Sequence, residues 1–134
     1  MARLLKQLEA KRLDLPGRIS LEVVSGAIGS KMTFRIVEIP VAKWGDKPRG
    51  PHRHRGFEEC IHVLKGRGVL EADSGEVRMV PGDTVLVPPN EKHMTVNTGP
   101  EPMLLLCFFP EPNVTARTEE FPPLKAKAKQ KVRE

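Results

Sequence analysis

The sequence predicts an all-β protein built as one domain, and three observations carry this prediction. The chain has 134 residues, enough for one hydrophobic core and too few for two. It contains 13 proline and 11 glycine residues, which favour many turns over long helices. Short runs rich in valine, isoleucine and phenylalanine recur between turn signals at intervals of roughly 8 to 12 residues, a spacing typical of sandwiches and closed barrels.

The first element that the sequence predicts is a short amphipathic helix within residues 1–12. Leu4, Leu5 and Leu8 recur there at helical spacing, and a Pro-Gly turn at residues 16–17 ends the segment. We expect the leucines to pack on the body of the protein. Residues 1–17 are therefore assigned to an N-terminal helical extension.

Eight short strands follow, each bounded by turn residues. They are predicted at residues 19–24, 32–39, 58–64, 68–73, 76–80, 84–87, 93–97 and 103–109. The Asp-Ser-Gly turn that ends at Gly75 predicts a tight hairpin, because glycine can adopt a positive φ where the strands reverse. Residues 18–112 are assigned to this β domain and residues 113–134 to an irregular, basic C-terminal tail.

The positive charge of the chain is concentrated at its C-terminal end. The formal net charge is +5, and the last ten positions hold five basic residues: Lys125, Lys127, Lys129, Lys131 and Arg133. No aromatic residues for base stacking are interleaved with them, and a short lysine-rich tail is usually a solvated extension. We therefore expect no nucleic-acid partner.

Neither a membrane anchor nor a disulfide framework is expected. No segment reaches the roughly 18 apolar residues that a membrane span needs, and the first residues lack the apolar core of a signal peptide. We expect a cytoplasmic protein without a membrane partner. Cys60 and Cys107 lie in apolar strand-like runs, which predicts reduced core thiols.

Two of the four histidines, His52 and His54, stand two residues apart after a segment rich in proline and glycine. In an extended chain their side chains point to the same face, one pleat repeat apart. This spacing allows both imidazoles to reach one metal ion. Either histidine alone would more often be an ordinary surface residue, so the prediction depends on further ligands.

A carboxylate and a third imidazole complete the candidate site. Strand alternation sends Glu58 and Glu59 to opposite faces, so only one of them can be a ligand. Glu59 shares its face with Ile61 and Val63, an apolar set suited to a barrel interior, and we predict that Glu59 is the ligand. His93 begins a later strand after a rigid Pro-Pro-Asn turn and can approach the same metal ion from a neighbouring strand.

These residues resemble the first signature motif of the cupin superfamily. That motif runs Gly, five residues, His-x-His, three or four residues, Glu, six residues, Gly. His52, His54, Glu59 and Gly66 match it, with four residues before the glutamate. The leading glycine corresponds to Gly45, which stands six residues before the histidine pair rather than five.

The second cupin motif is matched as well. It runs Gly, five residues, Pro-x-Gly, two residues, His, three residues, Asn, and Gly82, Pro88, His93 and Asn97 stand in register with it. Asn90 replaces the inner glycine. Asparagine is the non-glycine residue that tolerates positive φ best, so we expect the turn to be kept.

The resemblance covers residues 32–109 and implies a small double-stranded β-barrel, or jelly roll. It also implies that His52, His54, Glu59 and His93 bind one divalent transition metal ion. The residue types do not select among Fe, Mn, Ni, Co, Cu and Zn.

Quaternary structure and substrate follow from the same resemblance. Cupins commonly pair through sheet faces, so a homodimer is implied. Residues 103–109 are apolar on both faces and need a cover beyond their own core, which is either a partner subunit or the predicted N-terminal helix. The implied ligand is a small molecule.

Several reactions remain open for the predicted metal centre. Four protein ligands on a six-coordinate ion leave two positions for a substrate that offers two neighbouring oxygens. The chain contains no tyrosine, which removes the phenolic acid or base that some cupin lyases and epimerases use. We therefore favour a dioxygenase-like oxidation over an isomerase, decarboxylase or hydrolase. The alternative from another class is a non-catalytic module that binds or senses a small ligand.

Further site residues are predicted around the four ligands. Asn97 lies on the His93 face and is a candidate for orienting that ring. His62 would serve as an acid or base only if it faces a cavity, and is otherwise an exterior strand residue. Four residues are candidates either for lining a pocket or for plain core packing: Phe34, Trp44, Cys107 and Phe109.

Overall fold

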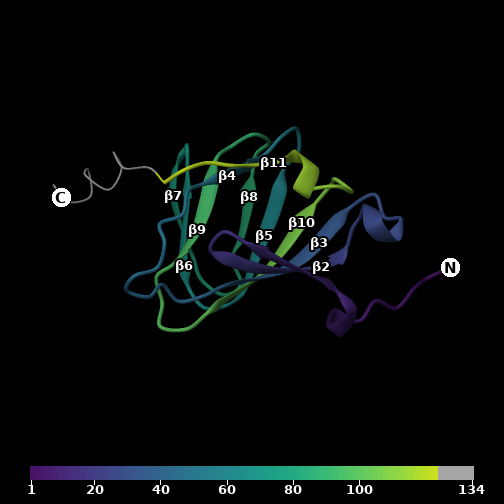
Figure 1. Cartoon of the computed structure of the whole chain (residues 1–134), viewed down its shortest axis with the longest axis horizontal. Coiled ribbons are helices and arrows are strands. Elements are labelled where there is room, and N and C mark those ends of the chain that lie inside the picture. Colours follow the sequence, from purple (N-terminus) through teal and green to yellow (C-terminus); the bar gives the residue numbers. More distant parts are fainter. Residues whose placement is uncertain (124–134) are drawn as a thin grey trace.

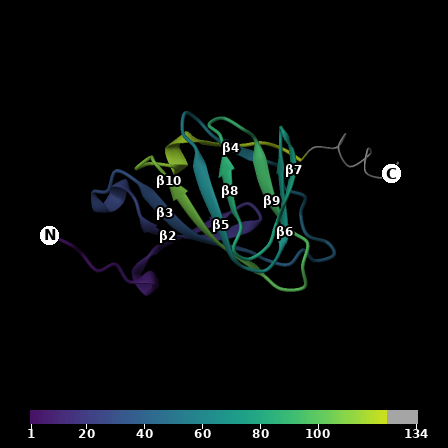
Figure 2. The same ribbon diagram turned by 180° about the vertical axis from the view of Figure 1, so that it is seen from behind.

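The computed structural model describes residues 1–123, which form two antiparallel β-sheets that face each other (Figure 1, Figure 2). The sheets have the strand orders β1-β2-β3-β10-β5-β8 and β11-β4-β9-β6-β7. The strands are β1 (Lys11–Leu15), β2 (Arg18–Val24), β3 (Thr33–Ile39), β4 (His52–His54), β5 (Glu59–Lys65), β6 (Gly68–Ala72), β7 (Gly75–Met79), β8 (Thr84–Val87), β9 (His93–Asn97), β10 (Met103–Phe109) and β11 (Thr118–Glu120). Three 3-10 turns accompany them: η1 (Gln7–Glu9) before β1, η2 (Gly26–Ile28) between β2 and β3, and η3 (Thr115–Arg117) between β10 and β11.

The predicted all-β class and double-stranded barrel are confirmed. Each of the eight predicted strands is present, with ends shifted by at most one residue. Burial alternates along the strands, most regularly in β3 and β9, because successive side chains point to opposite faces of a sheet. The inward-facing residues of both sheets form one core, to which Val37, Leu70 and Leu105 belong.

The predicted N-terminal helix is wrong. Only the single 3-10 turn η1 forms there, and the following residues form strand β1, which pairs with β2. The side chains of Leu4 and Leu8 are 83% and 99% exposed, so they do not pack on the body. A short helix is marginal without tertiary packing, whereas pairing with β2 satisfies the backbone groups of β1. Figure 1 and Figure 2 show the N-terminal segment extending away from the barrel.

The segment predicted to be an irregular tail begins with regular structure. Strand β11 pairs antiparallel with β4, with Thr118 opposite His54. The basic residues of the predicted tail lie outside the described residues. No helix within residues 1–123 is long and apolar enough to cross a membrane. The cytoplasmic location stays a prediction.

The two cysteines do not share one environment. Both are free, but only Cys107 is buried in the core as predicted. Cys60 is half-buried, and its neighbours in the sheet are Leu86 and Phe108. It therefore lies on the outer face of the six-stranded sheet.

The turn before β9 confirms the expected tolerance of asparagine. Asn90 has φ 69°, the one positive φ of a non-glycine residue in the described chain. Its backbone N–H donates to the His54 carbonyl at 2.9 Å, and its Oδ1 accepts from the Gly56 N–H at 3.1 Å. These bonds attach the turn that precedes His93 to the end of β4. The two sequence motifs are thus connected by one hydrogen bond between main-chain groups and one to a side chain.

Glycine is required at position 66 for two separate reasons. Its φ is +78°, and an added Cβ would lie 2.8 Å from the Pro102 carbonyl oxygen and 2.9 Å from the Met103 Cα. We expect Gly66→Ala to lower the free energy of unfolding by about 2 to 4 kcal/mol, measured by urea denaturation. Gly82→Ala is the matched control, because Gly82 has φ +95° but nothing within 4 Å of its added Cβ. It should cost about 1 to 2 kcal/mol; equal losses would contradict the role of the contact.

Candidate metal centre

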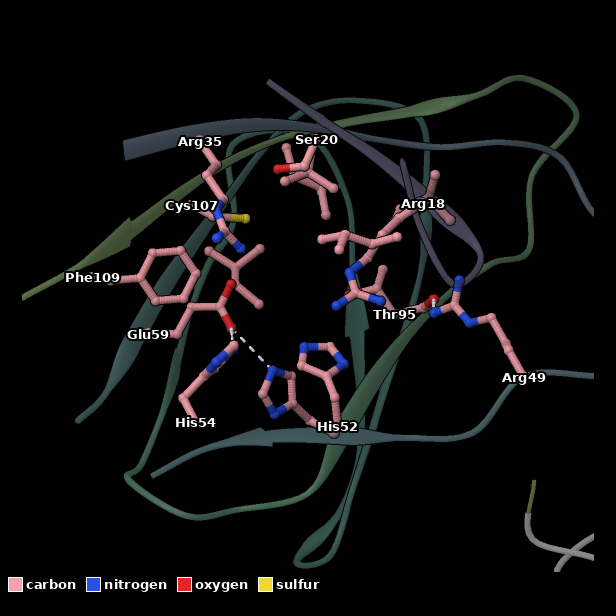
Figure 3. A pocket seen from close by; sticks show the side chains of 16 residues that line it. Arg18, Ser20, Arg35, Arg49, His52, His54, Glu59, Thr95, Cys107 and Phe109 are labelled. Carbon is pink, nitrogen blue, oxygen red and sulfur yellow. Dashed lines mark hydrogen bonds and ion pairs between the residues drawn. The ribbon is translucent and has the colours of Figure 1, made fainter. Parts of the chain in front are cut away.

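The four predicted ligands come from three strands of two sheets. His52 and His54 lie on β4, and His93 is the first residue of β9, directly opposite His52 in the register. Glu59 is the first residue of β5 and belongs to the other sheet. The candidate centre therefore lies between the sheets, and Figure 3 shows His52, His54 and Glu59 directed into the same cavity.

These side chains are close enough together to share one ion. One ligand atom from each of the four residues lies within 4.8 Å of the others. The exposed fractions are 8% for His52, 4% for His54, 5% for Glu59 and 1% for His93. Two ligands about 2.1 Å from a common ion are at most about 4.2 Å apart. Small adjustments of side chains are thus sufficient for coordination.

Two of the imidazoles are oriented by hydrogen bonds that also indicate their tautomers. Thr118 Oγ1 donates to the Val114 carbonyl at 2.8 Å, so it accepts from Nδ1–H of His54 at 2.9 Å. The Glu91 carbonyl can only accept, so Nδ1–H of His93 donates to it at 2.9 Å. In the neutral rings both Nε2 atoms then carry a lone pair directed at the centre of the site, as in metal-binding histidines.

A cation is needed between these nitrogens and the carboxylate. Oε1 of Glu59 lies 3.1 Å from Nε2 of His54 and 2.9 Å from Nε2 of His93. A carboxylate oxygen and a nitrogen lone pair are both acceptors, so protons on the rings or a metal ion must stand between them. Three imidazoles and one carboxylate are a ligand set that divalent transition ions use. The residues present therefore fit such an ion.

The charges of the site agree with this requirement. Burial acts to raise the pKa of Glu59, but hydrogen bonds from His54 and His93 outweigh it and hold the pKa well below its ordinary value. Burial also acts to lower the pKa of His93, yet its bond to Glu59 raises the pKa overall. The pKa of His52 is well below the ordinary value because of burial and the nearby Arg18. A carboxylate and a neutral His52 are the forms that bind metal.

Two of the four predicted pocket residues line the cavity. Cys107 and Phe109 do so. Phe34 and Trp44 do not, which corrects the prediction. Phe34 lies on the outward side of β3 and stacks on Phe108 with ring centroids 4.9 Å apart. Trp44 belongs to the loop between β3 and β4, where no strand directs it inward, and it is fully exposed.

Asn97 has a different role from the one predicted. It is buried, and its Nδ2 donates to the Ile39 carbonyl at 3.0 Å and to the Glu101 carbonyl at 2.8 Å. No hydrogen bond links it to His93 within the described chain. Its amide instead holds the end of β3 against the turn that follows β9.

His62 does not face the cavity. Its Nδ1 lies 2.9 Å from Thr84 Oγ1 on β8, and its side chain is on the outer face of the six-stranded sheet. This is the exterior position that strand alternation gives it. It is not placed to exchange protons with a molecule in the cavity.

Sequence reasoning missed the polar wall of the cavity. The cavity has a volume of about 30 Å³, and its lining includes Arg18, Ser20, Arg35 and Arg49. Arg35 forms an ion pair with Glu22 at 2.9 Å. Alternation along β2 would have found Arg18 and Ser20, because a polar face on a barrel strand indicates a site. Arg49 belongs to an irregular loop and carried no such signal.

The comparison with protein families identifies the class of the chain. Residues 37–109, more than half of the chain, match the family model for the cupin domain. The chain therefore belongs to the cupin family, as the two sequence motifs predicted.

Curated relatives match over short segments. An uncharacterised protein of Methanocaldococcus jannaschii is 36% identical over 56 residues, which are 42% of this chain and 45% of the relative. A glucose-6-phosphate isomerase of Pyrococcus horikoshii is 44% identical over 64 residues, which are 44% of this chain and 34% of the relative. The chain thus spans less than half the length of these relatives.

Solved structures confirm the fold. Pac13 of Streptomyces, a nucleoside dehydratase, superposes with a TM-score of 0.73 at 16% identity and covers 95% of this chain and 97% of its own. The oxalate decarboxylase of Lactobacillus farciminis gives a TM-score of 0.67 at 19% identity, over 85% of this chain and 34% of its own. At these identities the similarity is one of fold.

We expect protein purified without chelator to contain near-stoichiometric transition metal, measured by elemental analysis. Glu59→Gln and His54→Ala should lose most of it, because each removes one of four ligands. Glu58→Gln is the matched control, since Glu58 is the exposed neighbour of Glu59 in the sequence. Thr118→Val should weaken metal binding by roughly 10- to 100-fold, the usual effect of losing a hydrogen bond to a ligand. Unchanged metal content in Glu59→Gln would exclude the site.

Proposed function

We propose that this cupin is a metal-dependent enzyme acting on a small molecule that binds the metal ion through two neighbouring oxygens. One observation carries the proposal. The Nε2 atoms of His54 and His93 converge on the Glu59 carboxylate, and their Nδ1 hydrogens are already donated to other acceptors. The lone pairs of these nitrogens and the carboxylate need a cation between them, which supports the presence of a bound metal ion.

A bound divalent ion would act as a Lewis acid that polarises the oxygens of a chelating substrate. The chain contributes orientation and the exclusion of water. Phe109 and Phe57 stand against His54, with ring centroids 5.0 and 5.6 Å from its ring, and shield this side of the centre. The cavity of about 30 Å³ admits only a small group without movement of side chains.

Dioxygenase-like oxidation is the reaction that the cavity favours. Apart from the four predicted ligands and the arginines, Cys107 is the titratable residue in its described lining. Burial and the nearby Glu59 raise the pKa of this thiol well above its ordinary value, so it stays protonated. A site with few groups for acid or base catalysis suits a reaction whose difficult step belongs to the cofactor.

Isomerisation of a hydroxy-carbonyl compound is the second candidate, because relatives 44% identical over 64 residues are named glucose-6-phosphate isomerase. Such a reaction needs a base to move a proton between neighbouring carbons. Within the described lining, the carboxylate of Glu59 and the neutral imidazole of His52 are groups able to accept that proton. This reaction asks one predicted ligand to act also as a base.

One assay separates these reactions. Metal-reconstituted protein is mixed with hydroxy acids, keto acids, diketones, catechols and sugar phosphates, while oxygen uptake and product formation are followed in air and under argon. We expect substrate-dependent oxygen uptake that is lost in Glu59→Gln and kept in Glu58→Gln. Conversion that proceeds equally under argon would replace oxidation by isomerisation or another non-redox reaction. Ligand binding without turnover throughout the panel would identify a non-catalytic binding module.

We further propose that the chain forms a homodimer through the outer face of its six-stranded sheet. The face carries the stacked pair Phe34 and Phe108, and Phe108 is 42% exposed. Leu106 lies beside Ile36 in the register, and Leu86 is 61% exposed. The predicted N-terminal helix does not form, so it does not cover this face. A contiguous apolar surface of this kind supports an interface between subunits.

Phe108→Lys should convert the dimer to monomer, because it places a charge in the apolar surface. Sedimentation velocity would measure the change. The matched control is Val77→Lys, which alters a residue of nearly equal exposure, 43%, on strand β7 of the other sheet. A wild-type protein that sediments as a monomer, or a Phe108→Lys variant that remains dimeric, would exclude this interface.

A further inference from the structure

The wall of the cavity formed by β2 differs from the rest of the barrel interior. Arg18 and Ser20 lie two residues apart on this strand, and both side chains line the cavity. Figure 3 shows the Arg18 guanidinium directed toward the ring of His52, and the Ser20 hydroxyl at the edge of the cavity on the side of Arg35 and Cys107. Arg49, from the loop before β4, stands next to this wall. Polar and charged groups are thus placed within reach of the metal centre.

The Ser20 hydroxyl has no partner in the protein. The residue is 0% exposed, and its Oγ is the one buried side-chain nitrogen or oxygen of the described residues without a hydrogen bond. Burying a hydroxyl without a partner costs free energy, and native proteins keep few such groups. Because Ser20 belongs to the lining of the cavity, a ligand that reaches this oxygen would satisfy it.

The neighbouring arginines give this wall an excess of positive charge. Burial and the charge of Arg18 lower the pKa of Arg49 to about 10, although Glu120 and Glu71 oppose the shift. Arg18 forms an ion pair with Glu120 at 3.1 Å and donates to the Pro16 carbonyl at 2.9 Å. These two bonds occupy part of its five N–H donors.

Arg49 is held by the main chain. It donates to the carbonyl oxygens of Gly17 and Thr95. Arg35, the third arginine of the cavity, forms an ion pair with Glu22 at 2.9 Å, as Arg18 does with the partly exposed Glu120. Glu59 is the one carboxylate among the described lining residues, so the three arginines outnumber it, and Arg18 and Arg49 lie on the side of the cavity next to His52.

We infer that Arg18, Ser20 and Arg49 form a subsite for an oxyanion, a carboxylate or phosphate group of the bound molecule. A guanidinium offers parallel N–H donors that match two oxygens of such a group, and the serine hydroxyl adds a third donor. The inference rests on the proposed function at one point, because that proposal makes the bound molecule a substrate. The subsite selects a small anion and places its remaining oxygens next to the predicted ligands.

Anion binding by metal-free protein tests the subsite. Inorganic phosphate and malonate are titrated by calorimetry at constant ionic strength, with the neutral malonamide as a control. We expect at least one anion to bind, and Arg18→Gln to weaken its binding by about tenfold or more. Arg12→Gln is the matched control, because Arg12 lies on the adjacent strand β1 with an exposed side chain and loses the same charge.

Ser20→Ala separates a ligand-binding role from a structural one. It should weaken anion binding several-fold, while the thermal midpoint of the metal-free protein stays the same or rises, because an unpartnered hydroxyl has been removed. A lower midpoint with unchanged anion affinity would assign Ser20 to the scaffold and overturn its part in the subsite.

The outcome for the subsite is independent of the outcome for the metal. The inference would be overturned if neither anion binds, or if wild type and Arg18→Gln bind with equal affinity. It would also be overturned if binding requires the loaded metal and is unaffected by Arg18→Gln. The metal content of Arg18→Gln should equal that of wild type, since Arg18 is not a predicted ligand. If only Glu59→Gln loses metal and neither anion binds, the proposed metal-dependent enzyme stands. An anionic class of substrate is then excluded.

Discussion

The need for a cation between the Glu59 carboxylate and the imidazole nitrogens is the constraint on which the structure depends. A carboxylate removed from water is costly unless it is paired, and two of the partners of Glu59 are imidazole nitrogens that can themselves be acceptors. The register places His52 opposite His93, and the facing sheet supplies Glu59. The barrel thus brings the four candidate ligands within 4.8 Å of one another.

The elements around the centre serve this constraint. Strand β11 places Thr118 beside His54, and the turn ending at Glu91 places a carbonyl beside His93. Each contact fixes one ring nitrogen as a donor and leaves the other for the centre. The bond from the Asn90 N–H to the His54 carbonyl couples the two histidine-bearing strands through the main chain. One ring is therefore oriented by a side-chain hydroxyl and the other by a main-chain carbonyl.

The sequence predicted the parts of the fold whose signal is local. Alternating apolar residues and Pro/Gly turns located eight strands, and motif spacing located the four residues that converge. The N-terminal helix was wrong because leucine spacing is local information, whereas the pairing of β1 with β2 is set by the partner strand. Thr118 was missed because it lies in a segment without an apolar pattern. Glu91 acts through its carbonyl, which every residue type possesses, so its identity carried no signal.

The cavity was harder to predict than the ligands. Trp44 was a reasonable pocket candidate by residue type, but its loop leaves it exposed, and Asn97 satisfies carbonyl groups rather than an imidazole. Arg18 and Ser20 occupy inward positions that alternation along β2 would have indicated. Polar residues on an otherwise apolar barrel wall are thus a more informative signal than aromatic residues in loops.

Strand β11 has a consequence for how such proteins diversify. The segment 37–109 that defines the family carries all four candidate ligands, yet Thr118 lies after it and Arg18 and Ser20 lie before it. The segment that the family model matches is therefore shorter than the part of the chain that surrounds the candidate site. A protein that shares only the segment matching residues 37–109 would share the candidate ligands without the hydroxyl beside His54 or the polar side chains of β2.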